Sequence, residues 1–277
     1  MKLRDSSRRD FLQTVSAVSI GCWLSPHGSA APKTDDGFVE LFDGRTLNGW
    51  HTNAGRIGHG TGGLWRVADG VLTGEQDPPG SGNGGLLLSD RKFGDFELLI
   101  DMSPDWGPCS GVFFRCTEQG AGFQMYVDYH DNGNVGHLRG EMPGSFAIMP
   151  FKVSGILDGQ QRLTGFTTTI DPRATKWPEG VYEYCCTPQQ WLQTWKIGEW
   201  NTARIRCTGK YPQITTWING VRMCHFDGGK STLPAYDKER VFGTLGRSGS
   251  IGLQVHGGKG WPKGAKCRWR NIRIRQL

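Results

Sequence analysis

One short run of the chain combines residue types suited to acid–base chemistry with the spacing of a β-strand. It reads Phe123-Gln124-Met125-Tyr126-Val127-Asp128-Tyr129-His130. Successive side chains of a strand point to opposite faces, so the polar members share one face: Gln124, Tyr126, Asp128 and His130. A carboxylate and a histidine on one face can move protons, and both can bind a divalent metal ion. The alternative is a polar sheet face that only contacts solvent.

A second polar pair stands near the C-terminus. Gln254 and His256 are two positions apart and would share a face of another strand. Histidine is the side chain most easily tuned to exchange protons near neutral pH. A lone histidine is, however, more often a hydrogen-bonding residue than a catalyst.

Three charged residues could complete a site with these two strands. Arg115 lies two positions from Phe113 and would share its face. A guanidinium there can bind a ketone or hydroxyl oxygen through paired N–H donors. Its alternative role is a structural salt bridge. Glu141 follows the polar strand after a glycine-rich turn, and Glu75 lies in an expected loop. Each carboxylate could act as a base or could simply be solvated.

The elements that must position these residues read as all-β. Short runs rich in Val, Ile, Phe, Trp and Thr recur between Gly, Pro, Asn and Asp, and no long stretch has a helical period. Asn219-Gly220 is the strongest hairpin signal, because both residues tolerate the positive φ of a type I′ turn. Residues 150–195 hold few strand runs and predict a long loop, either functional or a surface insertion that packs its own tryptophans. The expected strands are 38–42, 64–67, 71–73, 85–89, 96–102, 112–116, 123–129, 204–208, 214–218, 221–226, 250–254 and 267–275.

The N-terminus predicts export. Ser7-Arg8-Arg9-Asp10-Phe11-Leu12-Gln13 is typical of a twin-arginine signal, and Ser29-Ala30-Ala31 offers a cleavage site. The apolar run between them is too short to span a bilayer, so we expect no transmembrane anchor. We therefore predict a signal peptide over residues 1–31, one domain over 37–277, and a periplasmic or secreted protein.

Composition excludes several classes of function. The formal net charge is +6, and the basic residues are scattered until the last ten positions, so no concentrated stripe predicts a nucleic-acid partner. Of the 8 cysteines, only Cys22 lies in the expected leader, and no spacing matches a zinc or redox motif. The chain also lacks a Gly-x-Ser-x-Gly elbow, a phosphate loop and a His-Glu-x-x-His motif. The Glu-x-Asp-x-x-Glu signature of sandwich-fold endoglucanases begins at Glu75-Gln76-Asp77 but is ended by Pro78, Pro79 and Gly80.

Three segments carry a resemblance to a known family. Leu41-Phe42-Asp43-Gly44-Arg45-Thr46-Leu47-Asn48-Gly49-Trp50 near the start resembles one terminal signature of the 3-keto-disaccharide hydrolases, and Gly252-Leu253-Gln254-Val255-His256-Gly257 with Arg270-Asn271-Ile272-Arg273-Ile274 resembles the other. The resemblance implies an all-β, concanavalin A-like (jelly-roll) sandwich of two antiparallel sheets. Gln124 stands where that family's strand usually has an acid, and Cys109 stands where it usually has Asn.

The resemblance also implies a reaction on carbohydrate. A hydrolase or lyase of this kind removes the proton at C2 of a 3-keto-glycoside, eliminates the group at C1 and rehydrates the product. His256 or Asp128 would be the base, and Arg115 with Gln254 would hold the enediolate. No cofactor is certain, but a divalent metal could replace Arg115 as the electrophile, with Asp128, His130 and Glu141 as ligands. The alternatives are a secreted, non-catalytic carbohydrate-binding β-sandwich module and a structural sandwich domain.

Overall fold

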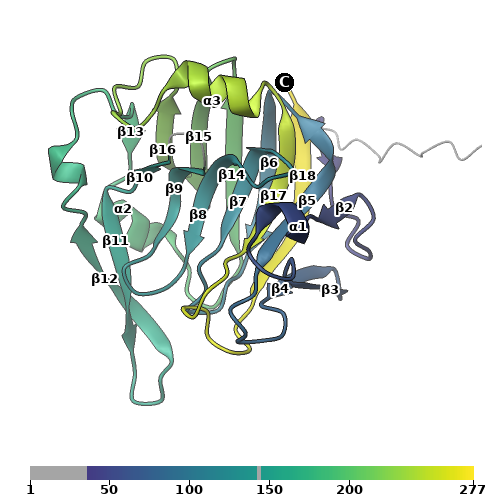
Figure 1. Cartoon of the computed structure of the whole chain (residues 1–277). Helices are drawn as coiled ribbons and strands as arrows, with labels where there is room; N and C mark the ends of the chain where they lie inside the picture. Colours follow the sequence, from purple (N-terminus) through teal and green to yellow (C-terminus); the bar gives the residue numbers. More distant parts are fainter. Residues whose placement is uncertain (1–35, 142–144) are drawn as a thin grey trace, which may run out of the picture. The chain divides into compact units, whose positions relative to one another are not determined.

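The computed structural model describes residues 36–141 and 145–277, so the expected signal peptide lies outside the described residues. Almost all of the regular structure is β, in two large sheets and one hairpin (Figure 1). The nine-stranded sheet has the order β13 (Tyr184–Cys185), β16 (Val221–Asp227), β15 (Gln213–Ile218), β14 (Asn201–Thr208), β6 (Phe96–Met102), β18 (Cys267–Gln276), β4 (Val71–Glu75) and β3 (Leu64–Ala68), with β1 (Val39–Glu40) also paired to β18.

The seven-stranded sheet has the order β10 (Phe146–Ile148), β9 (Asn134–Glu141), β8 (Gly122–Asp128), β7 (Gly111–Cys116), β17 (Gly249–Val255), β5 (Gly85–Phe93) and β2 (Trp50–Thr52). A separate hairpin joins β11 (Phe151–Leu157) to β12 (Leu163–Ile170). The helices are short: α1 (Ala54–Ile57), α2 (Pro188–Thr194), α3 (Lys238–Leu245) and the 3₁₀ turn Ala174–Lys176. Each helix is too short to cross a membrane, a statement limited to the described part of the chain.

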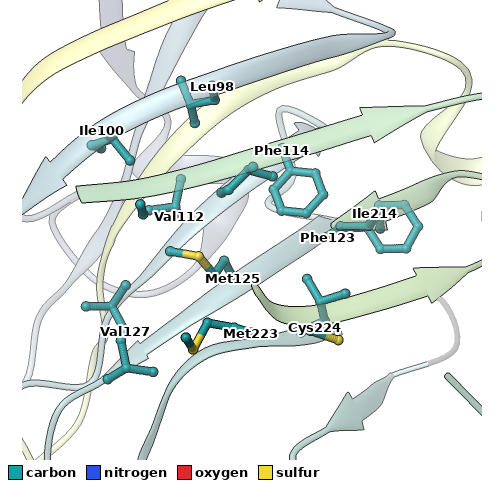
Figure 2. Close-up of a cluster of buried hydrophobic side chains, with 14 of the residues drawn as sticks. Leu98, Ile100, Val112, Phe114, Phe123, Met125, Val127, Ile214, Met223 and Cys224 are labelled. Carbon is teal, nitrogen blue, oxygen red and sulfur yellow. The ribbon is translucent and has the colours of Figure 1, made fainter. Parts of the chain in front are cut away.

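The two large sheets pack face to face over one apolar core, as Figure 2 shows. Val112, Phe114 and Met125 of the seven-stranded sheet meet Leu98 and Ile100 of the nine-stranded sheet, and all five side chains are buried. Burial of such side chains is the main favourable contribution to folding. The chain therefore forms the expected jelly-roll sandwich of antiparallel sheets.

The first and last strands of the domain lie side by side. The N-terminal strand β1 pairs with the last strand, with Val39 opposite Ile274. Asn219 and Gly220 connect β15 to β16 with φ values of 49° and 82°, as the hairpin signal predicted. The arginines of β18 lie on its outer, partly exposed side, while Trp269, Ile272 and Ile274 of that strand are buried.

The expected long loop at residues 150–195 is wrong in most of its length. Its first part is the β11–β12 hairpin, and its last part is α2, which begins with a capping box formed by Thr187 and Gln190. The tryptophans do not pack only among themselves. Trp191 is fully buried in the main core, where its indole N–H donates to the carbonyl of Val135 at 2.9 Å. The end of the segment is thus anchored in the core of the sandwich, whereas the β11–β12 hairpin forms a sheet of its own.

Arg115 does not lie where the alternation along its strand placed it. The register between β7 and β17 shifts at this point, so that β7 holds one extra residue, and Arg115 takes the left-handed conformation with φ 47°. Its side chain, 1% exposed, turns away from the polar face and forms an ion pair with Asp95 at 3.1 Å. The guanidinium also donates to the carbonyl of Gly209 at 2.8 Å and, more weakly, to that of Gly94. Arg115 is therefore a buried structural residue.

Removing this guanidinium should destabilise the fold. Arg115→Gln removes the cationic partner of the Gly94 and Gly209 carbonyls and one of the two cations that pair with Asp95, and breaking a buried pair typically costs about 3–5 kcal/mol. We expect a loss near the lower end of that range, because Asp95 is partly exposed and keeps its ion pair with Arg247. Denaturant unfolding measures it. The matched control, Arg66→Gln on the exposed side of β3, should stay within about 0.5 kcal/mol of the wild type. Equal midpoints for both variants would show that the Arg115 contacts contribute nothing.

Candidate active site

The central hollow, of about 260 Å³, lies on the outer face of the seven-stranded sheet. Its floor comes from β8, β9 and β17, and its walls come from loops. The residues around it are mostly polar: Cys109, Gln124, Tyr126, Asp128, Asn132, Arg139, Glu141, Met149, Arg173, Gln254 and His256. The hollow therefore gathers acids, cations and amides from four separate parts of the chain.

Strand β8 supplies the centre of the floor. Its apolar residues Phe123, Met125 and Val127 are buried in the core, so the alternating residues between them must point outward. Gln124, Tyr126 and Asp128 accordingly all line the central hollow, as the sequence pattern predicted.

Two glutamines form a bridge across the floor. The amide of Gln124 on β8 donates to the side-chain oxygen of Gln254 on β17 at 2.9 Å, and both side chains are almost fully buried. Strand β7 lies between them, and Gly111 is the β7 residue beneath the bridge. A Cβ atom at Gly111 would lie 1.8 Å from the Gln124 amide nitrogen, so the bridge requires a residue with no side chain. The hydroxyl of Ser110 also donates to the Gln254 carbonyl at 2.6 Å, which ties β17 to the start of β7.

Asp128 is the carboxylate best placed for acid–base chemistry. Burial raises its pKa above the ordinary range of an aspartate, because a charged carboxylate is poorly solvated there. A hydrogen bond from the Cys109 thiol at 3.1 Å and the positive charges of His130, His256 and Arg139 oppose this rise. A carboxyl group with a raised pKa is better matched to taking up and releasing protons near neutral pH.

Hydrogen-bond donors line the same hollow as that carboxylate. Burial raises the pKa of Tyr126 to about 12, so its phenol stays protonated at neutral pH. Arg139 on β9 lies 3.5 Å from the Tyr126 hydroxyl and forms an ion pair with Glu141. Arg173 lies on the wall, where Asp171 holds it through two hydrogen bonds of 2.7 and 3.1 Å. The central hollow therefore holds two guanidinium groups and a phenol that can donate to a ligand oxygen.

His256 lies directly after β17, at the junction of three hollows. Its backbone N–H donates to the carbonyl of Cys109, and its ring is exposed. It lines the central hollow and two neighbours. One neighbour, the α1 hollow, measures about 220 Å³ and is lined by Ile57, His59, Leu86, Phe113, Gln119, Gly120, Arg139, Glu141, Gln254 and His256. The other, the Trp106 hollow, measures about 530 Å³ and is lined by Trp106, Gly107, Cys109, His130, Asp131, Pro262 and the residues 256–261.

The structure brings together most, but not all, of the residues predicted from sequence. The central hollow contains Gln124, Tyr126, Asp128, Glu141, Gln254 and His256. His130 lies next to it, in the wall of the Trp106 hollow. Arg115 is absent from all three hollows for the reason given above. Glu75 is also absent: it is the buried last residue of β4, in the nine-stranded sheet, and not in a loop.

Sequence reasoning missed several lining residues. Arg139 shares its strand face with Glu141, and that alternation could have found it, but the glycines around it suggested a turn. Arg173 lies in the segment expected to be a loop, and Cys109, Asn132 and Met149 come from connections with no periodic signal.

One group of side chains could hold a metal ion. Ligand atoms of Cys109, Asp128 and His130 all lie within 4.8 Å of one another. The sequence suggested Glu141 as the third ligand, but Glu141 pairs with Arg139 instead, and Cys109 takes that place. Thiolate, carboxylate and imidazole together suit transition metals better than magnesium.

The glutamine bridge gives a test of the floor. Gly111→Ala should destabilise the fold by about 1–3 kcal/mol, because the new Cβ displaces the Gln124 amide. A Gly111→Ala/Gln124→Ala double variant should be more stable than the sum of the two single losses predicts, since the clash is gone. Gly243→Ala in α3 is the control: nothing lies within 4 Å of its Cβ, and it should be neutral or gain up to about 1 kcal/mol. Additive losses in denaturant unfolding would contradict the clash.

Comparisons with known proteins show the family of this chain and agree with its fold. Residues 37–275 match a family model described as a 3-keto-alpha-glucoside-1,2-lyase-like domain. A "3-keto-disaccharide hydrolase" of Bacteroides thetaiotaomicron is 32% identical over 270 residues, which cover 89% of this chain and 80% of that relative. A crystal structure of a "putative glycosyl hydrolase" from Parabacteroides distasonis has a TM-score of 0.51 and 15% identity, and covers 87% of this chain and 94% of its own. The last match bears on the fold alone. The family match spans nearly all of the described chain, and the protein therefore belongs to the 3-keto-alpha-glucoside-1,2-lyase-like family.

Proposed function

We propose that this protein cleaves 3-keto-glycosides by removing the proton at C2, eliminating the group at C1 and rehydrating the product. Membership of the family supports a carbohydrate substrate with a ketone at C3. The single observation that carries the mechanism is Asp128, a carboxyl group with a raised pKa that lines a hollow beside Arg139 and Tyr126.

The ketone determines what the site must provide. A carbonyl at C3 acidifies the proton on C2, because the negative charge left behind is shared with the C3 oxygen. The site then needs a base near C2 and donors near the C3 oxygen. Asp128 is the base, and Arg139 with Tyr126 supplies the donors. Arg139 takes the role that the sequence gave to Arg115, while Gln254 contributes its amide from the floor.

The reaction balances with one base and one water molecule. Asp128 takes the C2 proton, and the electron pair of that bond forms the enediolate. The enediolate re-forms the ketone as the C1–O bond breaks, and Asp128 gives the proton it holds to the departing oxygen. Water then adds its oxygen to C1 and loses a proton to Asp128, which passes that proton to C2, so the net change is hydrolysis. His256 also lines the hollow and is the alternative base.

Asp128→Asn should abolish this acid–base step and lower turnover by about 10² to 10⁴. The assay follows release of the C1 group from a 3-keto-glucoside. In the wild type, kcat/KM should fall as the pH drops through the pKa of Asp128, because a protonated carboxyl cannot accept the proton. The pH at which kcat/KM falls on the acidic side should lie above the ordinary aspartate pKa of about 3.9. The Asp128→Asn variant should not show this fall.

Two controls distinguish a catalytic role of Asp128 from a role of His256 and from a loss of folding. Thermal midpoints should not change, and His256→Ala should be assayed beside Asp128→Asn. Wild-type rates in a folded Asp128→Asn would overturn the assignment. Activity lost on chelation and restored by a divalent cation would instead favour a metal held by Cys109, Asp128 and His130. Glycan binding without turnover would favour the carbohydrate-binding module.

We also propose export through the twin-arginine pathway, which rests on Arg8-Arg9-Asp10-Phe11-Leu12 in the leader. Replacing both arginines by lysine keeps the charge but removes the paired motif, and it should leave the precursor in the cytoplasm. Fractionation followed by immunoblotting measures the distribution. The matched control replaces Lys2 and Arg4, which lie outside the motif, and should be exported normally. Normal export of the double-lysine variant would remove the basis for this proposal.

A further inference from the structure

The Trp106 hollow has no role in the acid–base steps of the proposed reaction. At about 530 Å³ it is twice the size of the central hollow. The two hollows adjoin each other, because Cys109 and His256 line both. A molecule held over Asp128 can therefore extend into the Trp106 hollow without leaving the cleft.

We propose that the Trp106 hollow binds the leaving unit of the substrate and that this unit is a ring with an apolar face, either an aryl group or a second pyranose. The proposal rests on the proposed function, because it takes Asp128 as the base at C2.

The order of residues along β8 gives the direction. Arg139 pairs in register with Gln124, near the start of the strand, and Asp128 lies four residues further on. His130 follows two residues later, in the wall of the Trp106 hollow. With the C3 oxygen at Arg139 and C2 at Asp128, the next ring carbon, C1, points toward His130. The group that leaves C1 therefore enters the Trp106 hollow.

The walls of this hollow suit a ring. Trp106, Trp261 and Pro262 line it, and glycines 257, 258 and 260 leave room beside them. Trp106 is partly exposed and held on its other sides by Tyr129, with ring centroids 5.0 Å apart, and by Phe166 at 5.9 Å. A fixed indole offers a large apolar face at little entropic cost. Within residues 36–141 and 145–277 its N–H donates no hydrogen bond, so it can serve a ligand hydroxyl.

The α1 hollow is the competing place for the leaving unit. Ile57, Leu86 and Phe113 give it an apolar floor. It shares Arg139, Glu141, Gln254 and His256 with the central hollow, but neither Asp128 nor His130 lines it. With the C3 oxygen at Arg139 and C2 at Asp128, the α1 hollow therefore lies at the part of the sugar remote from C1. The two hollows therefore make opposite predictions for variants.

The experiment compares kcat/KM for three 3-keto-α-glucosides that differ only at C1: methyl, 4-nitrophenyl and glucosyl. Trp106→Leu removes the indole face, and Gly260→Leu adds bulk at a position where a Cβ meets nothing within 4 Å. Both variants should lose about threefold to tenfold on the two ring substrates and nothing on the methyl glycoside, as expected for loss of one aromatic contact. Trp217→Leu, on the nine-stranded sheet, and Ile57→Ala should change none of the three.

Each outcome decides the proposal. A loss confined to one ring substrate supports it and identifies the occupant as aryl or sugar. Equal losses on all three substrates, or no loss in either variant, overturn it, and a ring-specific loss in Ile57→Ala assigns the leaving unit to the α1 hollow instead. If Trp106→Leu unfolds, Gly260→Leu decides. If the wild type turns over the methyl glycoside and neither variant changes the ratio of kcat/KM between ring and methyl substrates, this inference alone is refuted. A wild type that turns over none of the three substrates refutes the proposed function.

Discussion

Burial of Phe123, Met125 and Val127 between the two sheets fixes the position of the site, because it determines which way every second residue of β8 points. A slip of one residue in the register of this strand would send the polar set into the core and the apolar set into solvent. Packing energy thus holds Asp128 in place without any direct contact to it. The carboxylate can then remain in surroundings that disfavour its charge, because the core and not the carboxylate holds the strand there.

The part of the fold that could be predicted from sequence is the part set by local alternation and turn chemistry. The pattern of β8 and the turn at Asn219 belong to this class, since each follows from a few neighbouring residues. Strand β9 does not, because Gly136 and Gly140 resemble turn residues in the sequence. In the structure they allow close packing: a Cβ at Gly140 would lie 2.5 Å from the ring of Phe146. That requirement comes from a residue on another strand, and a single sequence does not display it.

The same distinction between local pattern and long-range contacts explains why the sequence predicted the wrong arginine for the site. Arg115 obeys the alternation in sequence, but one extra residue in β7 turns its side chain toward Asp95 and the carbonyl of Gly209. A bulge depends on the register with a distant strand, so local spacing cannot reveal it. Arg173 was missed for a related reason, since its place on the wall depends on the ion pair with buried Asp171. Local pattern thus identified the floor of the site, and long-range contacts decided which cation reaches it.

The cleft is divided between a sheet floor and loop walls. The loop between β17 and β18, yellow in Figure 1, runs past the end of the sheet, and Gly107 brings the loop before β7 against its Pro262. Core packing fixes the residues of the floor, but it places few demands on the length or composition of these loops. Exchange of loop segments between homologues would therefore change the walls of the cleft and leave floor residues such as Gln124, Asp128 and Gln254 in place. For protein engineering, the β-sandwich can be kept as a constant scaffold while its loops are exchanged.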